Sequence, residues 1–320
     1  MFSTRLNPTK PPAAHRAILE RVGAACRELR PIEDQCAGGA ERIDETRAIF
    51  EKHGVLQIGV PLAQGGVGDD PLLVALAAER IGREGLRVVR WFAIRAATGA
   101  AVRFQTTRGE SPNGSLMPQP IEPPEETFDA APRIAALLGL EEHLWNPTSP
   151  ELIYELNFKF CVAAGAIGVI ADCLETAVTW CGNQIKSGLS DNPLEELDRF
   201  ETQNRHRQIE LHVANTASDL ESARAIVYAA AELKSEFDRR PRSDHLRLET
   251  GTLVNEALSV AHKALARMFF GIEHGTYGVR PMVDCLPSRH RVFVDTKVCP
   301  RDRERGWLLQ KQIARYYLFE

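Results

Sequence analysis

The alternation of apolar and polar residues in the first hundred positions predicts a small set of helices. Apolar residues recur every three or four positions over 13–30 and 40–53, and Gly54 follows the second segment as a helix-ending residue. A third helix is expected to begin at Pro71 with Asp70 as its N-cap. Proline suits the first helical position, and an aspartate there accepts a hydrogen bond from a free backbone N–H group.

The second half of the chain carries the strongest helical pattern. Four long helices are expected there, at about 150–185, 193–237, 248–271 and 303–318. The first of them is apolar nearly all round over 158–170, which is typical of a helix in the centre of a bundle. Long antiparallel helices joined by loops indicate a helical bundle. Only 55–60 and 291–294 have a strand-like pattern.

The two helical parts are separated by a segment of different amino-acid composition. Residues 111–126 contain five prolines and few large apolar residues, which is typical of a linker or a surface loop. A short helix is expected at 128–140. The predicted organisation is an N-terminal helical domain at 1–104, a proline-rich linker at 105–149 and a C-terminal four-helix bundle at 150–320.

Composition and charge restrict the classes of function. The 320 residues include 39 Lys and Arg against 43 Asp and Glu, a net charge of −4, and 44% of the residues are hydrophobic. These values are ordinary for a soluble globular protein, and the acidic balance argues against a broad nucleic-acid surface. No apolar run reaches about 18 residues, so no membrane-spanning helix is expected. The first twelve residues lack the pattern of a secretory signal.

The cysteines indicate free thiols. There are seven of them, an odd number, and no Cys-x-x-Cys occurs, so a disulfide framework or a zinc ribbon is not expected. A reducing cytoplasm is the expected location. Cys285 and Cys299 flank Arg289-His290-Arg291, where a Cys/His nucleophile is one interpretation. Because no third orienting group can be placed there, incidental thiols are favoured.

No metal site is expected. Glu210 shares a helix face with His206, but His212 is six residues from His206 and points elsewhere. A di-iron bundle needs Glu-x-x-His on its core helices, and no histidine in the sequence has Glu or Asp three positions before it.

Several short motifs, taken in order, resemble the acyl-CoA dehydrogenase family. In the first half these are Phe50–Pro61 and the turn Gly65-Gly66-Val67-Gly68. In the second half they are Ala163–Gly168, Leu220–Arg224 and the glycine turn at Gly271–Gly278. The resemblance covers about residues 13–105 and 150–318.

This resemblance implies a mostly α fold with one domain missing. Members of the family have an N-terminal helical domain, a middle β-barrel and a C-terminal four-helix bundle. Here the interval at 105–149 is too short and too rich in proline to form the barrel, so the middle β domain is expected to be absent. Because family members pair their C-terminal bundles, a homodimer or homotetramer is expected.

The family's catalytic base falls on an unsuitable residue. The glutamate that removes the α-proton of an acyl thioester corresponds to Arg303, and an arginine stays protonated. Glu304 is one residue away, about 100° further round the helix. Some relatives carry the glutamate in the first helix of the bundle, a position that falls on Phe158, with Glu155 one turn earlier. Glu304 and Glu155 are therefore the candidate catalytic residues.

The positions that hold the flavin in the family are also changed. Gln184 stands where the family has an arginine that reaches the cofactor pyrophosphate, and Arg207 stands where it has a glutamine. The double glycine of the late turn becomes Gly275 and Thr276, in a turn that ends at Gly278. These five residues are the candidate cofactor contacts, and the changes lead us to expect no FAD.

Three functions follow from the resemblance. The first is a degenerate member that does not dehydrogenate by itself and that binds an acyl thioester, on CoA or a carrier protein, or a pathway partner. The second is an FAD-dependent oxidoreductase with a rearranged site that uses Glu304 or Glu155. The third is a non-catalytic subunit that assembles with a flavin-bearing dehydrogenase sister.

Overall fold

The computed structural model describes most of the chain. The described residues are 12–35, 41–60, 62, 65–68, 70–107, 150–187, 196–239, 244–273 and 290. The expected helices at 128–140 and 303–318 and the possible strand at 291–294 lie outside them.

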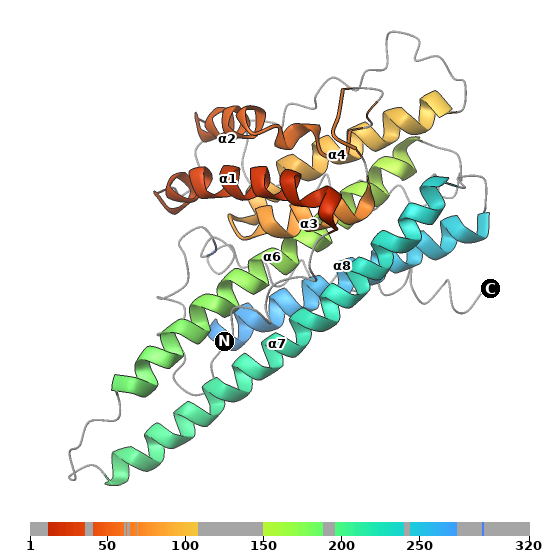
Figure 1. Cartoon of the computed structure of the whole chain (residues 1–320). Coiled ribbons are helices and arrows are strands. Elements are labelled where there is room, and N and C mark those ends of the chain that lie inside the picture. The colour runs from red at the N-terminus through yellow and green to blue at the C-terminus, as the bar shows by residue number, and fades with distance from the viewer. Residues whose placement is uncertain are drawn as a thin grey trace.

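Every regular element among the described residues is helical (Figure 1). The first half contains α1 (Ala13–Gln35), α2 (Glu41–Lys52), the short 3-10 helix η2 (Val55–Gln57), α3 (Pro71–Gly82) and α4 (Leu86–Thr107). The second half contains α6 (Pro150–Ser187), α7 (Glu196–Arg239) and α8 (Asp244–Glu273). The prediction of a mostly α fold is confirmed for this part of the chain.

Helix α6 lies at the centre of the arrangement (Figure 1). Helices α7 and α8 run alongside it on one side, and α3 and α4 pack against it on the other. The largest fully buried side chains come from both halves of the chain, and they include Phe50, Phe92, Phe160, Ile167 and Leu220. The N-terminal helices and the bundle helices therefore share one apolar core.

Local sequence signals place the N-terminal helices. In α1, Leu19, Val22, Cys26 and Leu29 follow the helical spacing, and all four are buried. After α2, Gly54 has a φ of 67°, the left-handed conformation expected for a residue that follows a helix.

The structure of the N-terminal half differs from the sequence-based expectation at three points. Helix α1 does not end at Pro31 but continues to Gln35. Residues 55–60 form no strand, because Val55–Gln57 is a 3-10 helix and Ile58 and Val60 make only isolated bridges to Gly68. The apolar pattern also did not predict α4, in which apolar residues are less concentrated on one face than they are in α1.

Helix α6 contains one segment with the length and composition of a membrane span, Leu156–Thr179. Its apolar run is interrupted by Lys159, Asp172 and Glu175, but its average composition is still apolar enough to pass for a span. Of its most apolar stretch of 18 residues, 78% is buried inside the protein. Contacts with neighbouring helices thus account for its composition, as in the core helix of a bundle.

The start of α3 confirms the predicted cap. The Asp70 carboxylate accepts a hydrogen bond of 3.0 Å from the backbone N–H of Leu72, and Pro71 occupies the first turn. The other Asp70 oxygen lies 2.9 Å from His15 Nε2, so the same side chain also ties α1 to α3.

Replacing Asp70 with alanine is expected to lower the free energy of unfolding by about 1 kcal/mol, because α3 loses its N-cap acceptor. Asp70→Ser keeps a capping oxygen but removes the carboxylate that contacts His15. Chemical denaturation of both variants therefore separates the cap from the His15 contact. Equal losses in the two variants would show that the cap contributes nothing.

Candidate functional site

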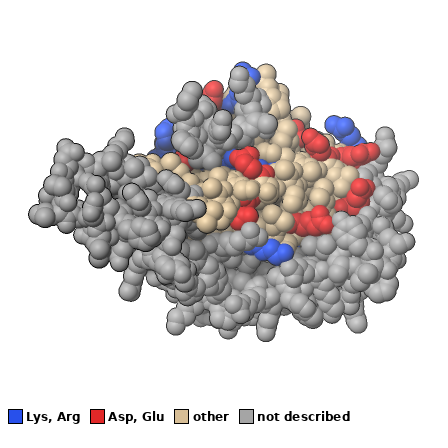
Figure 2. Space-filling model, turned by 90° about the horizontal axis from the view of Figure 1, so that it is seen from below, with Lys and Arg blue, Asp and Glu red and all other residues tan. Residues whose placement is uncertain are grey.

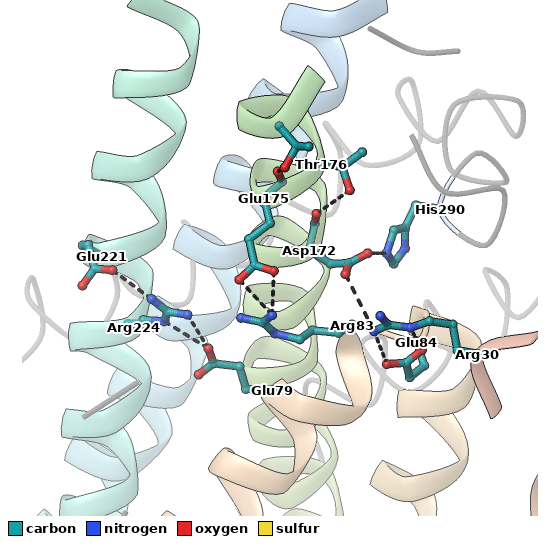
Figure 3. Close-up of polar contacts among 11 residues, drawn as sticks. Arg30, Glu79, Arg83, Glu84, Asp172, Glu175, Thr176, Glu221, Arg224 and His290 are labelled. Carbon is teal, nitrogen blue, oxygen red and sulfur yellow. Dashed lines mark hydrogen bonds and ion pairs between the residues drawn. The ribbon is translucent and has the colours of Figure 1, made fainter. Parts of the chain in front are cut away.

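Charged side chains converge where α3 meets α6 and α7, and we call this set the junction network (Figure 3). It consists of Arg30, Glu79, Arg83, Glu84, Asp172, Glu175, Glu221, Arg224, Tyr228 and His290. These residues come from α1, from α3 and the turn after it, from α6 and α7, and from position 290. Burying a charge costs free energy unless the charge is paired. A partly buried cluster of charged side chains is therefore a candidate functional site.

The innermost part of the network is a buried ion pair between α3 and α7. Glu79 Oε1 accepts hydrogen bonds of 3.0 and 2.6 Å from Nε and Nη2 of Arg224. The exposed fractions of the Glu79 and Arg224 side chains are only 3% and 5%. The Tyr228 hydroxyl donates to the other Glu79 oxygen at 2.6 Å, and Arg224 Nη1 also donates to Glu221.

Burial and neighbouring charges shift the pKa values of Tyr228 and Arg224. Burial raises the pKa of Tyr228 far above its ordinary value, and the adjacent Glu79 charge raises it further. Burial alone lowers the pKa of Arg224, but attraction to Glu79 outweighs it and the pKa is raised. Tyr228 is therefore a neutral hydrogen-bond donor and Arg224 a fixed cation at physiological pH.

The outer part of the network joins α6 to the end of α3 and to α1. Arg83 Nη1 donates to both oxygens of Glu175, at 2.9 and 3.0 Å. Arg30 forms a fork on Glu84, with distances of 3.0 Å from Nε and 2.7 Å from Nη2. Asp172 Oδ2 lies 2.9 Å from Nε2 of the fully buried His290.

A small cavity lies on another side of the same junction. Polar residues Asn157 and Lys234 line it together with Gly59, Pro71, Val74, Ala96, Ala100 and Phe160. Its volume of about 10 Å³ is close to what a single water molecule needs. Sites for cofactors and drug-sized ligands are far larger, on the order of 300–1,000 Å³. The Lys234 ammonium is already paired with Asp238, at 2.7 Å.

Cys26, Cys161 and Cys173 are free thiols, as expected from the sequence, and all three are buried. Burial raises the pKa of Cys26 and that of Cys161 to about 12. A thiolate is the reactive form of cysteine, so these two thiols are poor nucleophiles. Within the described residues, no group of three His, Cys, Asp or Glu side chains is arranged to hold a metal ion.

The described surface seen in Figure 2 carries many carboxylates. Exposed positions of α7 include Glu221, Glu232 and Glu236. A nucleic-acid backbone is bound through Lys and Arg, whereas these three described positions carry carboxylates.

The structure places three of the residues singled out from the sequence on helices. Glu155 and Gln184 lie near opposite ends of α6, about 44 Å apart along its axis, and Arg207 lies in the first half of α7. The structure does not bring Glu155 and Gln184 together in one site. Phe158, at the alternative base position, is only partly buried and stacks on Tyr154 with ring centroids 6.2 Å apart.

The other predicted site residues lie outside the described part of the chain. They are Gly275, Thr276, Gly278, Arg303 and Glu304. Their roles as cofactor contacts or as a base stay predictions.

Sequence reasoning missed the junction network. One signal was present, because Glu79 lies among the apolar residues of α3, a position where an acidic side chain needs a buried partner. His290 was noted only beside two cysteines. Its partner in the structure, Asp172, is 118 residues away in the sequence, so no local sequence pattern predicts the contact.

In comparisons with known proteins, no family model, no curated protein and no solved structure matches this chain.

Proposed function

We propose that the chain is a helical protein of the acyl-CoA dehydrogenase type that does not dehydrogenate by itself. In this proposal it acts by binding an acyl thioester, carried by CoA or by a carrier protein, or a pathway partner. The proposal rests on the sequence resemblance described above and on the packing of the described helices.

The observation that carries the proposal is the closed contact along the glycine face of α6. A Cβ atom on Gly168 would lie 1.9 Å from the carbonyl oxygen of Glu79 on α3. A Cβ atom on Gly165 would lie 2.3 Å from Val89 Cγ1 on α4. The glycine face of α6 is thus filled by α3 and α4, which leaves no room for a ligand between these helices at Gly165 and Gly168.

The pairing of the junction carboxylates supports the same proposal. Glu79, Glu84 and Glu175 each accept hydrogen bonds from a guanidinium group, and Asp172 contacts His290. A general base must reach the proton that it removes, in an open site next to the substrate. The described carboxylates of the junction are instead used to join helices.

Absorbance and native mass spectrometry of the purified full chain test the proposal. We expect a colourless protein whose native mass increases on addition of octanoyl-CoA or of an octanoylated carrier protein. We also expect no reduction of an artificial electron acceptor in the presence of octanoyl-CoA. CoA without an acyl group and the carrier protein without one serve as controls for recognition of the acyl chain.

Other results would overturn the proposal in distinct ways. A yellow protein that bleaches with octanoyl-CoA would establish the FAD-dependent alternative, and Glu304→Gln and Glu155→Gln would then identify the base. Co-purification of a flavin-bearing dehydrogenase that needs this chain for activity would establish the subunit alternative. A colourless protein that binds neither thioester would rule out the thioester-binding function.

A further inference from the structure

The imidazole of His290 occupies a polar site made by other parts of the chain. Its ring is 0% exposed, and its Nε2 lies 2.9 Å from Asp172 Oδ2 on α6 (Figure 3). An ionised carboxylate can only accept hydrogen bonds, so Nε2 carries the hydrogen of this contact. The other ring nitrogen, Nδ1, is buried and has no hydrogen-bond partner within the described structure.

Arg30 and Glu84 lie behind Asp172 in the same network. Arg30 of α1 holds Glu84 in a two-bond fork, and its Nη2 lies 4.0 Å from Asp172 Oδ1. The Glu84 and Asp172 side chains are 2% and 8% exposed. Two buried carboxylates, which are hydrogen-bond acceptors, thus lie beside one half-exposed guanidinium. A ring that offers an N–H donor suits such a site.

We infer that Asp172, backed by Arg30 and Glu84, forms a receptor site for an imidazole ring, and that the chain fills this site with its own residue 290. The contact joins position 290 to the junction of α1, α3 and α6. The inference does not depend on the proposed function, because it concerns a contact that is present whether or not a thioester binds.

The complete burial of the ring gives the inference a direct consequence. Truncation of His290 leaves a buried space of the shape of the lost ring, next to the Asp172 carboxylate that the ring contacted. A polar cavity of this kind takes up a small molecule that restores the hydrogen bond and the packing. Free imidazole has the same ring and the same N–H group.

The test is rescue of the full-length His290→Ala variant by imidazole. We expect truncation to lower the midpoint of thermal unfolding and imidazole to raise it again, with a smaller effect on the unaltered protein. Binding to the folded state alone lowers the unfolding constant about a hundredfold when imidazole is at about a hundred times its Kd. 1-Methylimidazole, at a pH where both compounds are neutral, has no N–H donor and is expected not to rescue.

Two further variants keep the inference falsifiable even if His290→Ala does not fold. Gln places its amide nitrogen where His has Nε2, whereas the shorter Asn does not reach, so His290→Gln is expected to be more stable than His290→Asn. Addition of Asp172→Asn to His290→Ala is expected to abolish the imidazole effect. Equal rescue by the two compounds, equal rescue of the unaltered protein, or equal stability of the Gln and Asn variants would overturn the inference.

Discussion

Replacing Arg224 with methionine is expected to lower the free energy of unfolding by about 3–5 kcal/mol. The substitution leaves the Glu79 carboxylate buried, with its side chain only 3% exposed, while the Tyr228 hydroxyl still donates to it. Removal of one member of a buried pair costs more than the pair itself contributes, because the other charge stays in a poorly solvated place. Methionine retains most of the apolar stem of Arg224, so the loss reports mainly the charge.

Chemical denaturation of matched variants measures this loss. Arg47 makes a comparable contact of 2.9 Å with Glu51, but those side chains are 63% and 54% exposed. Arg47→Met is therefore expected to cost only about 0.3–0.5 kcal/mol. The double variant Glu79→Met/Arg224→Met removes both charges and is expected to recover part of the loss. Similar losses for Arg224→Met and Arg47→Met would show that burial does not control the strength of the pair.

Replacing Gly168 with alanine is expected to destabilise the protein by about 3 kcal/mol, at the upper end of the usual cost of overpacking. The new Cβ atom would meet the Glu79 carbonyl oxygen at 1.9 Å and the Gly82 Cα at 3.0 Å. Both are backbone atoms and cannot rotate away, so α3 and α6 must separate. Their separation also displaces Glu79, the residue that pairs with Arg224.

Gly251 provides the control for this second prediction. It lies in α8, where an added Cβ would come no closer than 3.8 Å to Leu156 Cδ2. Alanine has a better helix propensity than glycine by about 1 kcal/mol, so Gly251→Ala is expected to be neutral or stabilising. Thermal and chemical unfolding of both variants measure the contrast. A stable Gly168→Ala variant would contradict the close approach of α3 and α6, and with it the packing argument for a closed junction.

Much of the helical framework could be predicted because its signals are local. The Asp70–Pro71 start of α3 depends on residues within one turn, and so does the left-handed Gly54 after α2. The strand predicted at 55–60 failed for the opposite reason. Its alternating apolar residues satisfy a strand pattern, but a strand also needs a partner with which to pair, and Ile58 and Val60 find only Gly68.

The candidate site was much less accessible to sequence reasoning. The resemblance directed attention to Glu155, Gln184 and Arg207, which the structure places on α6 and α7 without bringing Glu155 and Gln184 together. The charged groups that do meet are Glu79 with Arg224 and Asp172 with His290. The first pair is separated by 145 residues, and the pairing depends on how α3 crosses α7.

The sequence by itself determined most of the helical segments, although not α4, and that α6 is apolar enough to be the central helix, because backbone propensity, capping and apolar spacing act over a few residues. Only the tertiary structure decided that α3 approaches α6 through glycines and that the buried carboxylates meet arginines and a histidine from distant segments. Those contacts depend on the relative positions of whole helices, which are set by the sum of many weak packing interactions across the shared core.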